Sequence, residues 1–210
     1  MIPRRAAIVL FCGDPARDER QKQLPPHFLR RLHRALIARL SSVEAELYVA
    51  HHDAVEFRIG DRAWPSRSLA MQLETALRFC FGRGHARVLL VAGDAALDPR
   101  VVRRAIEMRE PVLAASGDGG FAIAGFSELP EIEWESVVAD RSHAAARLRE
   151  RVAMRELPRI DDIDSIEDAR RIARLFTLIG SWLARALFVD AAIEVGWTIP
   201  CSIPARSPPA

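Results

Sequence analysis

Acidic residues next to predicted strand ends are the side chains of this chain best suited to chemistry. Asp118 lies in the segment Gly117–Phe121, where glycines on both sides let the backbone approach a ligand closely. Asp94 ends a buried-looking strand, and Asp161, Asp162 and Asp164 precede a helix. Carboxylate oxygens are the ligands that Mg²⁺ or Mn²⁺ prefers. The sequence therefore suggests a metal-assisted nucleotide site, although an Asp-Gly-Gly string is also typical of an ordinary hairpin turn.

Several other residues are candidates for contacts with a nucleotide. Lys22 is the only lysine of the chain, which makes it a candidate for a functional role. Gly93, Gly119 and Gly120 offer backbone without side chains beside Asp94 and Asp118. Trp134 could stack on a base or a sugar. The structural alternatives are a solvated lysine and a tryptophan of the core.

Other reactive side chains give weaker signals. Cys12 ends the first predicted strand, but no histidine partner is identifiable, so a buried small hydrophobe is the favoured interpretation. Ser142 and His143 have no acidic orienter in sequence reach, and no hydrolase triad is visible.

Strands alternate with helices along the chain, which predicts an α/β fold. The apolar run 6–12 is typical of a central parallel strand, and apolar residues then recur at helical spacing to residue 40. We expect further strands at 46–50, 86–92, 112–115, 121–126 and 154–157, a hairpin within 55–64, and helices at 69–81, from 99 and at 142–152. A capping-box-like sequence at Ser165–Asp168 predicts the start of a long helix.

The open sheet of such a fold binds ligands beyond the carboxyl ends of its strands. Asp94, Asp118 and the 161–164 cluster all follow strands or strand turns, so we expect them to share that edge. Carboxylates gathered there would repel one another unless a divalent cation lay between them. The alternative for 161–168 is helix-capping charge that interacts only with the helix dipole.

Length and composition predict one globular domain over 1–198, followed by an extended or disordered proline-rich tail at 199–210. The net charge of +2 comes from interspersed residues, which argues against nucleic acid. The three cysteines show no paired spacing, which favours a reducing, cytoplasmic location. Charges interrupt the apolar stretch 176–195, so we expect no membrane span; its helix at 179–195 could complete the core or form a homodimer face.

Four motifs together resemble an uncharacterised bacterial group of glycosyltransferase-like proteins. That group is related to nucleotide-diphospho-sugar transferases with the GT-A fold and to small nucleotidyltransferases. The motifs are Ala92-Gly93-Asp94, Asp118-Gly119-Gly120-Phe121, Trp134-Glu135-Ser136 and Asp162-Ile163-Asp164, in the order of the group. The resemblance implies a three-layer α/β/α domain with a mainly parallel twisted sheet. It also implies a transferase that uses a nucleotide-sugar, or a nucleoside triphosphate, on an unknown acceptor.

Carried onto this sequence, the resemblance assigns metal binding to Asp94 and Asp164. Asp118 would position the acceptor or act as a base, and Lys22, Gly93, Gly119, Gly120 and Trp134 would contact the nucleotide. The segment Asp14–Leu24 departs from the group: it keeps Lys22 and Leu24 but lacks the glycine and the arginine of the phosphate loop. Asp18 and Glu19 add negative charge there, which disfavours phosphate unless they point away. A degenerate, non-catalytic binding partner is therefore the alternative hypothesis.

Overall fold

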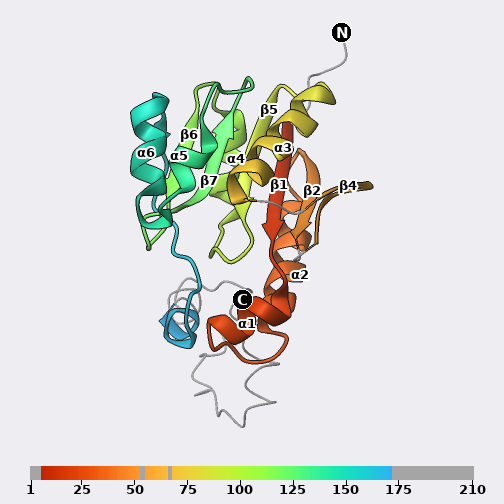
Figure 1. Cartoon of the computed structure of the whole chain (residues 1–210), viewed down its shortest axis with the longest axis vertical. Coiled ribbons are helices and arrows are strands. Elements are labelled where there is room, and N and C mark those ends of the chain that lie inside the picture. The colour runs from red at the N-terminus through yellow and green to blue at the C-terminus, as the bar shows by residue number, and fades with distance from the viewer. Residues whose placement is uncertain (1–5, 53–54, 66–67, 172–210) are drawn as a thin grey trace, which may run out of the picture.

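The computed structural model describes residues 6–52, 55–65 and 68–171, and its centre is one eight-stranded sheet (Figure 1). The strand order is β4-β3-β2-β1-β5-β7-β6-β8. The pairings make six strands run in one direction, while β3 and β7 run the opposite way. The strands are β1 (Ala6–Cys12), β2 (Glu46–His52), β3 (Glu56–Ile59), β4 (Arg62–Pro65), β5 (Arg87–Ala92), β6 (Val112–Ala115), β7 (Phe121–Phe126) and β8 (Arg155–Glu156).

Helices cover both faces of the sheet, which gives the three-layer α/β/α arrangement that the family resemblance implies. Successive residues of β1 belong to two separate cores because side chains alternate across a strand. Ile8 and Leu10 pack with residues of α2 and α4, and Ala7 and Val9 pack in the same core as residues of α3, α5 and α6. The helix bounds are α2 (Phe28–Leu40), α3 (Leu69–Gly82), α4 (Pro99–Glu107), α5 (Trp134–Val138) and α6 (Ala144–Arg151).

The strand β7 is antiparallel to both of its neighbours, for a simple geometric reason. Only five residues, 116–120, connect β6 to β7. A connection of that length allows a hairpin but not a crossover to a parallel strand. The turn that carries Asp118 is therefore held between two hydrogen-bonded strands at one edge of the sheet.

The segment after β1 is a helix, whereas the sequence analysis treats it as an irregular loop. Helix α1 spans Pro15–Gln21, and the Asp14 carboxylate accepts from the backbone N–H groups of Ala16 and Arg17. An aspartate followed by proline is a typical helix start. Figure 1 places α1 at the end of the sheet toward which the β1 arrow points, the same end as the blue segment after β8.

Two parts of the predicted domain organisation lie outside the described residues. These are the helix expected at 179–195 and the tail at 199–210. The described part of the chain does include the start of the helix after Ser165, where the Ser165 hydroxyl accepts from the Asp168 N–H as the capping pattern predicts. Within the described ranges, no helix has the length and apolar character needed to cross a membrane.

Glu19 joins α1 to α2, and its replacement by Gln is expected to destabilise the fold by about 1 kcal/mol. The side chain is 7% exposed, and its two oxygens accept from the N–H groups of His27 and Leu29. Glutamine retains only one acceptor oxygen and loses the charge. Urea denaturation checks this, with the exposed Glu44→Gln as the control. Equal urea midpoints for Glu19→Gln and Glu44→Gln would contradict the role of Glu19 as a cap of α2.

Candidate functional site

A cleft of about 730 Å³ opens beyond the carboxyl ends of β1, β2 and β5. Its size is within the range of small-molecule sites. It is lined by five carboxylates, three Arg or Lys side chains and two histidines, together with glycines and with polar and apolar residues. The charged residues are Asp18, Asp94, Asp118, Asp162, Asp164, Arg17, Lys22 and Arg141.

Backbone hydrogen bonds bring the 161–164 segment to the end of β5. Beyond β8 the chain continues along β6, and the N–H of Ile160 donates to the carbonyl of Ala115. The chain then crosses to the residues after β5, where the N–H of Ile163 donates to the Asp94 carbonyl at 2.9 Å. An isolated antiparallel bridge pairs Ala95 with Asp162. The shared edge that the sequence analysis predicts is thus built by main-chain contacts.

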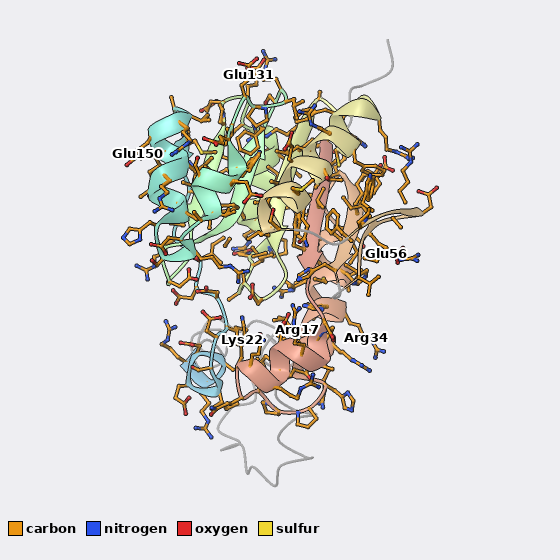
Figure 2. The ribbon with its side chains drawn as sticks, in the orientation of Figure 1. Arg17, Lys22, Arg34, Glu56, Glu131 and Glu150 are labelled. Atoms are coloured by element: carbon orange, nitrogen blue, oxygen red, sulfur yellow. The ribbon has the colours of Figure 1, made fainter. Side chains whose placement is uncertain are left out.

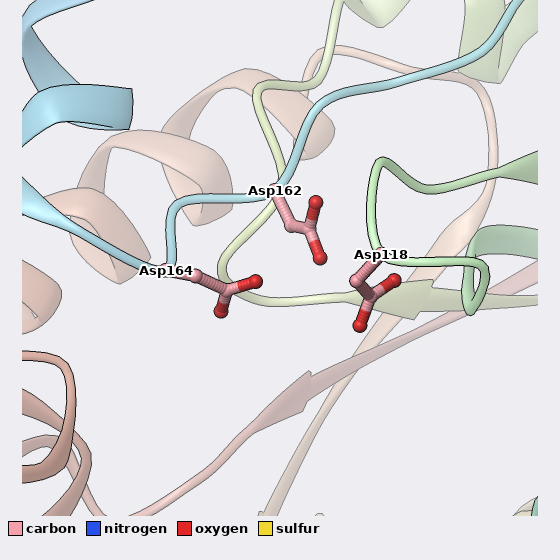
Figure 3. Close-up of side chains that lie close together, drawn as sticks. All are labelled: Asp118, Asp162 and Asp164. Atoms are coloured by element: carbon pink, nitrogen blue, oxygen red, sulfur yellow. The ribbon is translucent and has the colours of Figure 1, made fainter. Parts of the chain in front are cut away.

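Three carboxylates meet at this edge. One oxygen from each of Asp118, Asp162 and Asp164 lies within 4.8 Å of the other two, and the three side chains point toward a common region (Figure 3). Asp162 and Asp164 come from the same extended segment, and Asp118 comes from the β6–β7 turn. Hard oxygen donors from three side chains fit a divalent cation such as Mg²⁺ or Mn²⁺. Asp94 lies outside this trio.

Uncompensated negative charge is most evident at Asp162. Burial, and then the neighbouring carboxylates of Asp164 and Asp118, raise the pKa of Asp162 to about 6. The Asp162 carboxylate accepts a hydrogen bond from the Gly117 N–H at 3.2 Å, which is a neutral donor. A divalent cation between the carboxylates would remove this repulsion, so the donor set fits such a metal in charge as well as in ligand type.

Asp118 is held in place by its own turn. Its carboxylate accepts from the Ser116 hydroxyl and, at 2.8 Å, from the Gly120 N–H. Partial burial raises the pKa of Asp118, but these hydrogen bonds outweigh burial, so the pKa lies below its usual value. The side chain is therefore ionised at neutral pH, a state that suits a metal ligand or an orienting group.

Lys22 lies between the two aspartates that the sequence analysis assigns to metal. Its ammonium is 2.7 Å from Asp94 and 2.6 Å from Asp164, and it donates to the Ile163 carbonyl at 3.0 Å. Burial lowers the pKa of Lys22, but the attraction of Asp94 and Asp164 exceeds this effect and raises it overall. Figure 2 shows Lys22 and Arg17 at the same end of the molecule, opposite Glu131 and Glu150.

The three candidate glycines have different surroundings. Gly93 lines the cleft, and a Cβ there would lie 2.3 Å from the carbonyl oxygen of Phe11. Gly120 also lines the cleft, where a Cβ would crowd the Asp118 carboxylate and the Ser116 hydroxyl at 3.0 Å. Gly119 has a φ of +91°, and a Cβ would lie 1.9 Å from the Ser142 carbonyl oxygen. Gly119 is thus required for the turn itself and is not among the cleft-lining residues.

The structure favours the core alternative for Trp134. The side chain is 3% exposed and packs edge-on against Phe126, with ring centroids 6.1 Å apart. It belongs to the core beneath α3, α5 and α6 and does not line the cleft. The indole is thus buried away from the cleft, which corrects the expectation of a stacking contact with the nucleotide.

The region after β1 contains cleft residues that the sequence analysis did not single out. Gly13 lines the cleft, and its missing side chain makes room for Asp18, because a Cβ there would lie 2.1 Å from Asp18 Oδ2. Arg17 bonds to Asp18 and lies 3.3 Å from His52 Nε2. Of the two acidic residues that disfavour phosphate, Glu19 points away and Asp18 faces Arg17. Arg141, which follows α5 in the chain, also lines the cleft.

The structure does not favour a nucleophilic role for Cys12 or for Ser142. Burial, followed by the field of Asp94, raises the pKa of the Cys12 thiol to about 12, so a thiolate is disfavoured. Ser142 and His143 do have an acidic partner, Asp140, which corrects the sequence analysis. Both Asp140 and Ser142 contact the same ring nitrogen, His143 Nδ1, at 2.7 and 2.9 Å. A catalytic relay needs both ring nitrogens, so this group is not a hydrolase triad.

Comparison with known proteins places the fold. No family model matches this chain, and no curated protein matches it. A solved structure from Desulfovibrio desulfuricans G20, a "putative nucleotide-diphospho-sugar transferase", is similar with a TM-score of 0.67 and 17% sequence identity. The match covers 92% of this chain and 98% of that one. The predicted fold of the nucleotide-diphospho-sugar transferase type is therefore confirmed.

Proposed function

We propose that this protein is a metal-dependent transferase that binds a nucleotide-sugar donor in the cleft. The observation that carries the proposal is the group formed by Asp118, Asp162 and Asp164, which lies in the cleft at the carboxyl ends of the strands. The fold adds support, because open α/β sheets bind nucleotides at this edge. The name of the similar structure points to the same class of donor.

The metal ligands that we propose differ from the pair Asp94 and Asp164 given in the sequence analysis. Asp164 keeps its predicted role, Asp162 and Asp118 join it, and Asp94 instead anchors Lys22. The cation, Mg²⁺ or Mn²⁺, would neutralise charge on the departing phosphate. The cleft contains five carboxylates and only three Arg or Lys side chains, so a diphosphate without a cation would meet net negative charge.

The remaining residues of the cleft position the reactants. In the transfer, the bond between the sugar and the diphosphate breaks, and its electron pair leaves with the nucleoside diphosphate. An acceptor atom bonds to the sugar carbon and releases its proton to solvent water. The Asp118 carboxylate is ionised and is fixed by hydrogen bonds from the Ser116 hydroxyl and the Gly120 N–H. It would therefore hold the cation in a defined position. Lys22 and Arg17 supply positive charge for phosphates, and Gly93 and Gly120 leave the backbone accessible.

Thermal melting against nucleotide-sugars and nucleoside triphosphates, each with and without Mn²⁺ or Mg²⁺, tests the proposal. A ligand at a hundred times its dissociation constant stabilises the folded state by about 2.7 kcal/mol, which raises the melting temperature by several degrees. We expect a metal-dependent shift with one nucleotide-sugar. A shift confined to triphosphates would instead indicate a nucleotidyltransferase. The absence of any shift in a cooperatively melting protein would contradict both and favour a non-catalytic binding partner.

A further inference from the structure

Lys22 and the carboxylate trio share one residue, Asp164. Asp164 contributes an oxygen to the group with Asp118 and Asp162, and one of its oxygens is 2.6 Å from the Lys22 ammonium. The ammonium directs its remaining contacts to Asp94 and to the Ile163 carbonyl. These three contacts match the three donors of a lysine. The metal-free site thus contains one fully engaged internal cation.

A divalent cation at the trio and the ammonium at Asp164 would repel each other. Both would lie within a few ångströms of the same carboxylate; the lysine side chain is 20% exposed and the Asp164 side chain is 48% exposed. Repulsion between like charges is strong where water screens it poorly. Lys22 is also held by Asp94, which lies outside the trio, so the ammonium can leave Asp164 without losing every partner.

We propose that Lys22 is the resident counter-cation of the acidic site, and that a divalent cation displaces it from Asp164. The displaced ammonium then becomes available to a phosphate of the bound nucleotide. This inference rests on the metal-dependent nucleotide binding proposed above. Lys22 would therefore do more than contact a phosphate. It competes with the metal for Asp164 first and then binds the nucleotide.

Two consequences follow for binding. The metal alone binds weakly, because it must break the contact between Lys22 and Asp164. A diphosphate offers the displaced ammonium a new partner, so metal and diphosphate each increase the affinity of the other. Reciprocity of coupled binding requires that the two enhancements be equal.

Binding of Mn²⁺ to the full chain, measured by electron paramagnetic resonance of free Mn²⁺, tests the competition. We expect Lys22→Gln to bind Mn²⁺ at least about tenfold more tightly than the unsubstituted protein. The effect should persist from about 0.1 to 0.5 M KCl, since salt screens long-range fields more than direct contacts. Arg17→Gln, which removes a cleft cation bonded to Asp18 and not to the trio, should show a smaller and salt-sensitive effect.

The second arm uses inorganic pyrophosphate as a diphosphate probe. In the unsubstituted protein, Mn²⁺ and pyrophosphate together should raise the melting temperature by more than the sum of their separate effects. In Lys22→Gln this excess should be lost, whereas Lys22→Arg, which keeps the positive charge, should retain part of it.

The outcomes separate this inference from the proposed function. Unchanged or weaker Mn²⁺ binding in Lys22→Gln, with Mn²⁺ binding abolished in Asp162→Asn, would overturn the competition and leave the metal site intact. Equal increases in Mn²⁺ affinity in Lys22→Gln and Arg17→Gln would also overturn the competition. The loss of one positive charge from the cleft would then explain both increases. No Mn²⁺ binding in any variant, with or without pyrophosphate, would overturn both the competition and the metal-dependent function.

Discussion

Asp162→Asn is expected to abolish metal-dependent nucleotide binding while it stabilises the metal-free protein. Removing an outer partner of a metal ligand typically costs about 10- to 100-fold in affinity, and loss of a ligand should cost at least as much. Asparagine retains the oxygen that accepts from the Gly117 N–H, so the local fold should persist. Stability should rise because a carboxylate that repels Asp164 and Asp118 is removed.

The size of the stabilisation depends on pH. The pKa of Asp162 rises from 3.8 to about 6 on folding, so its ionised form destabilises the folded state above pH 6. The unsubstituted protein should regain this stability as pH falls from about 7 to 4, and Asp162→Asn should not. After allowance for partial exposure of the group, we expect a difference on the order of 1–2 kcal/mol at pH 7.5 that falls to a small fraction of this value near pH 4.

Chemical denaturation without metal at pH 7.5 and pH 4, together with melting in Mn²⁺ and nucleotide, measures both effects. Asp161→Asn is the matched control, because Asp161 pairs with Arg171 at 2.6 Å and lies outside the trio. The control should keep nucleotide binding. An Asp162→Asn protein that binds metal and nucleotide normally would contradict the assignment of Asp162.

Gly119→Ala has the largest expected effect on stability, a loss of more than about 3 kcal/mol. Two causes add. The φ of +91° is strained for alanine, and the new Cβ would lie 1.9 Å from the Ser142 carbonyl oxygen, which belongs to the backbone and cannot rotate away. The turn must shift, and Asp118 shifts with it, so metal-dependent binding should also weaken.

Gly84→Ala separates the two causes. Gly84 has a similar φ of +86°, but a Cβ at this position would have no neighbouring atom within 4 Å. This control should lose only the backbone contribution, about 1–2 kcal/mol. Urea midpoints for the two variants provide the comparison. Equal losses would show that the contact between the turn and Ser142 does not constrain the site.

Much of the fold could be predicted from local patterns. The strand at 6–12 has the bounds expected from its apolar run, and Asp98 caps α4 as the Asp98-Pro99 pair indicates. The same signal, Asp14-Pro15, begins α1, a helix start that the sequence analysis missed because it treated this segment as a loop. Local chemistry sets these boundaries, so each of them is readable from a few adjacent residues.

The site was less predictable because its contacts are distant in sequence. Asp162 and Asp164 are two apart in an extended segment, a spacing that puts side chains on one side and could have indicated both as ligands. The contact of Lys22 with Asp94 spans 72 residues. No local pattern reports such a contact, because it depends on how α1 and the segment after β8 meet beside β5.

A crystal structure of the protein with Mn²⁺ and the nucleotide-sugar that stabilises it most would test the central claim directly. Anomalous scattering identifies manganese by element and locates it within the cleft. We expect one manganese peak within coordination distance of Asp118, Asp162 and Asp164, with a diphosphate oxygen as a further ligand and the Lys22 ammonium turned from Asp164 to phosphate. A nucleotide bound in the cleft without manganese at the trio, or manganese bound elsewhere, would contradict the account.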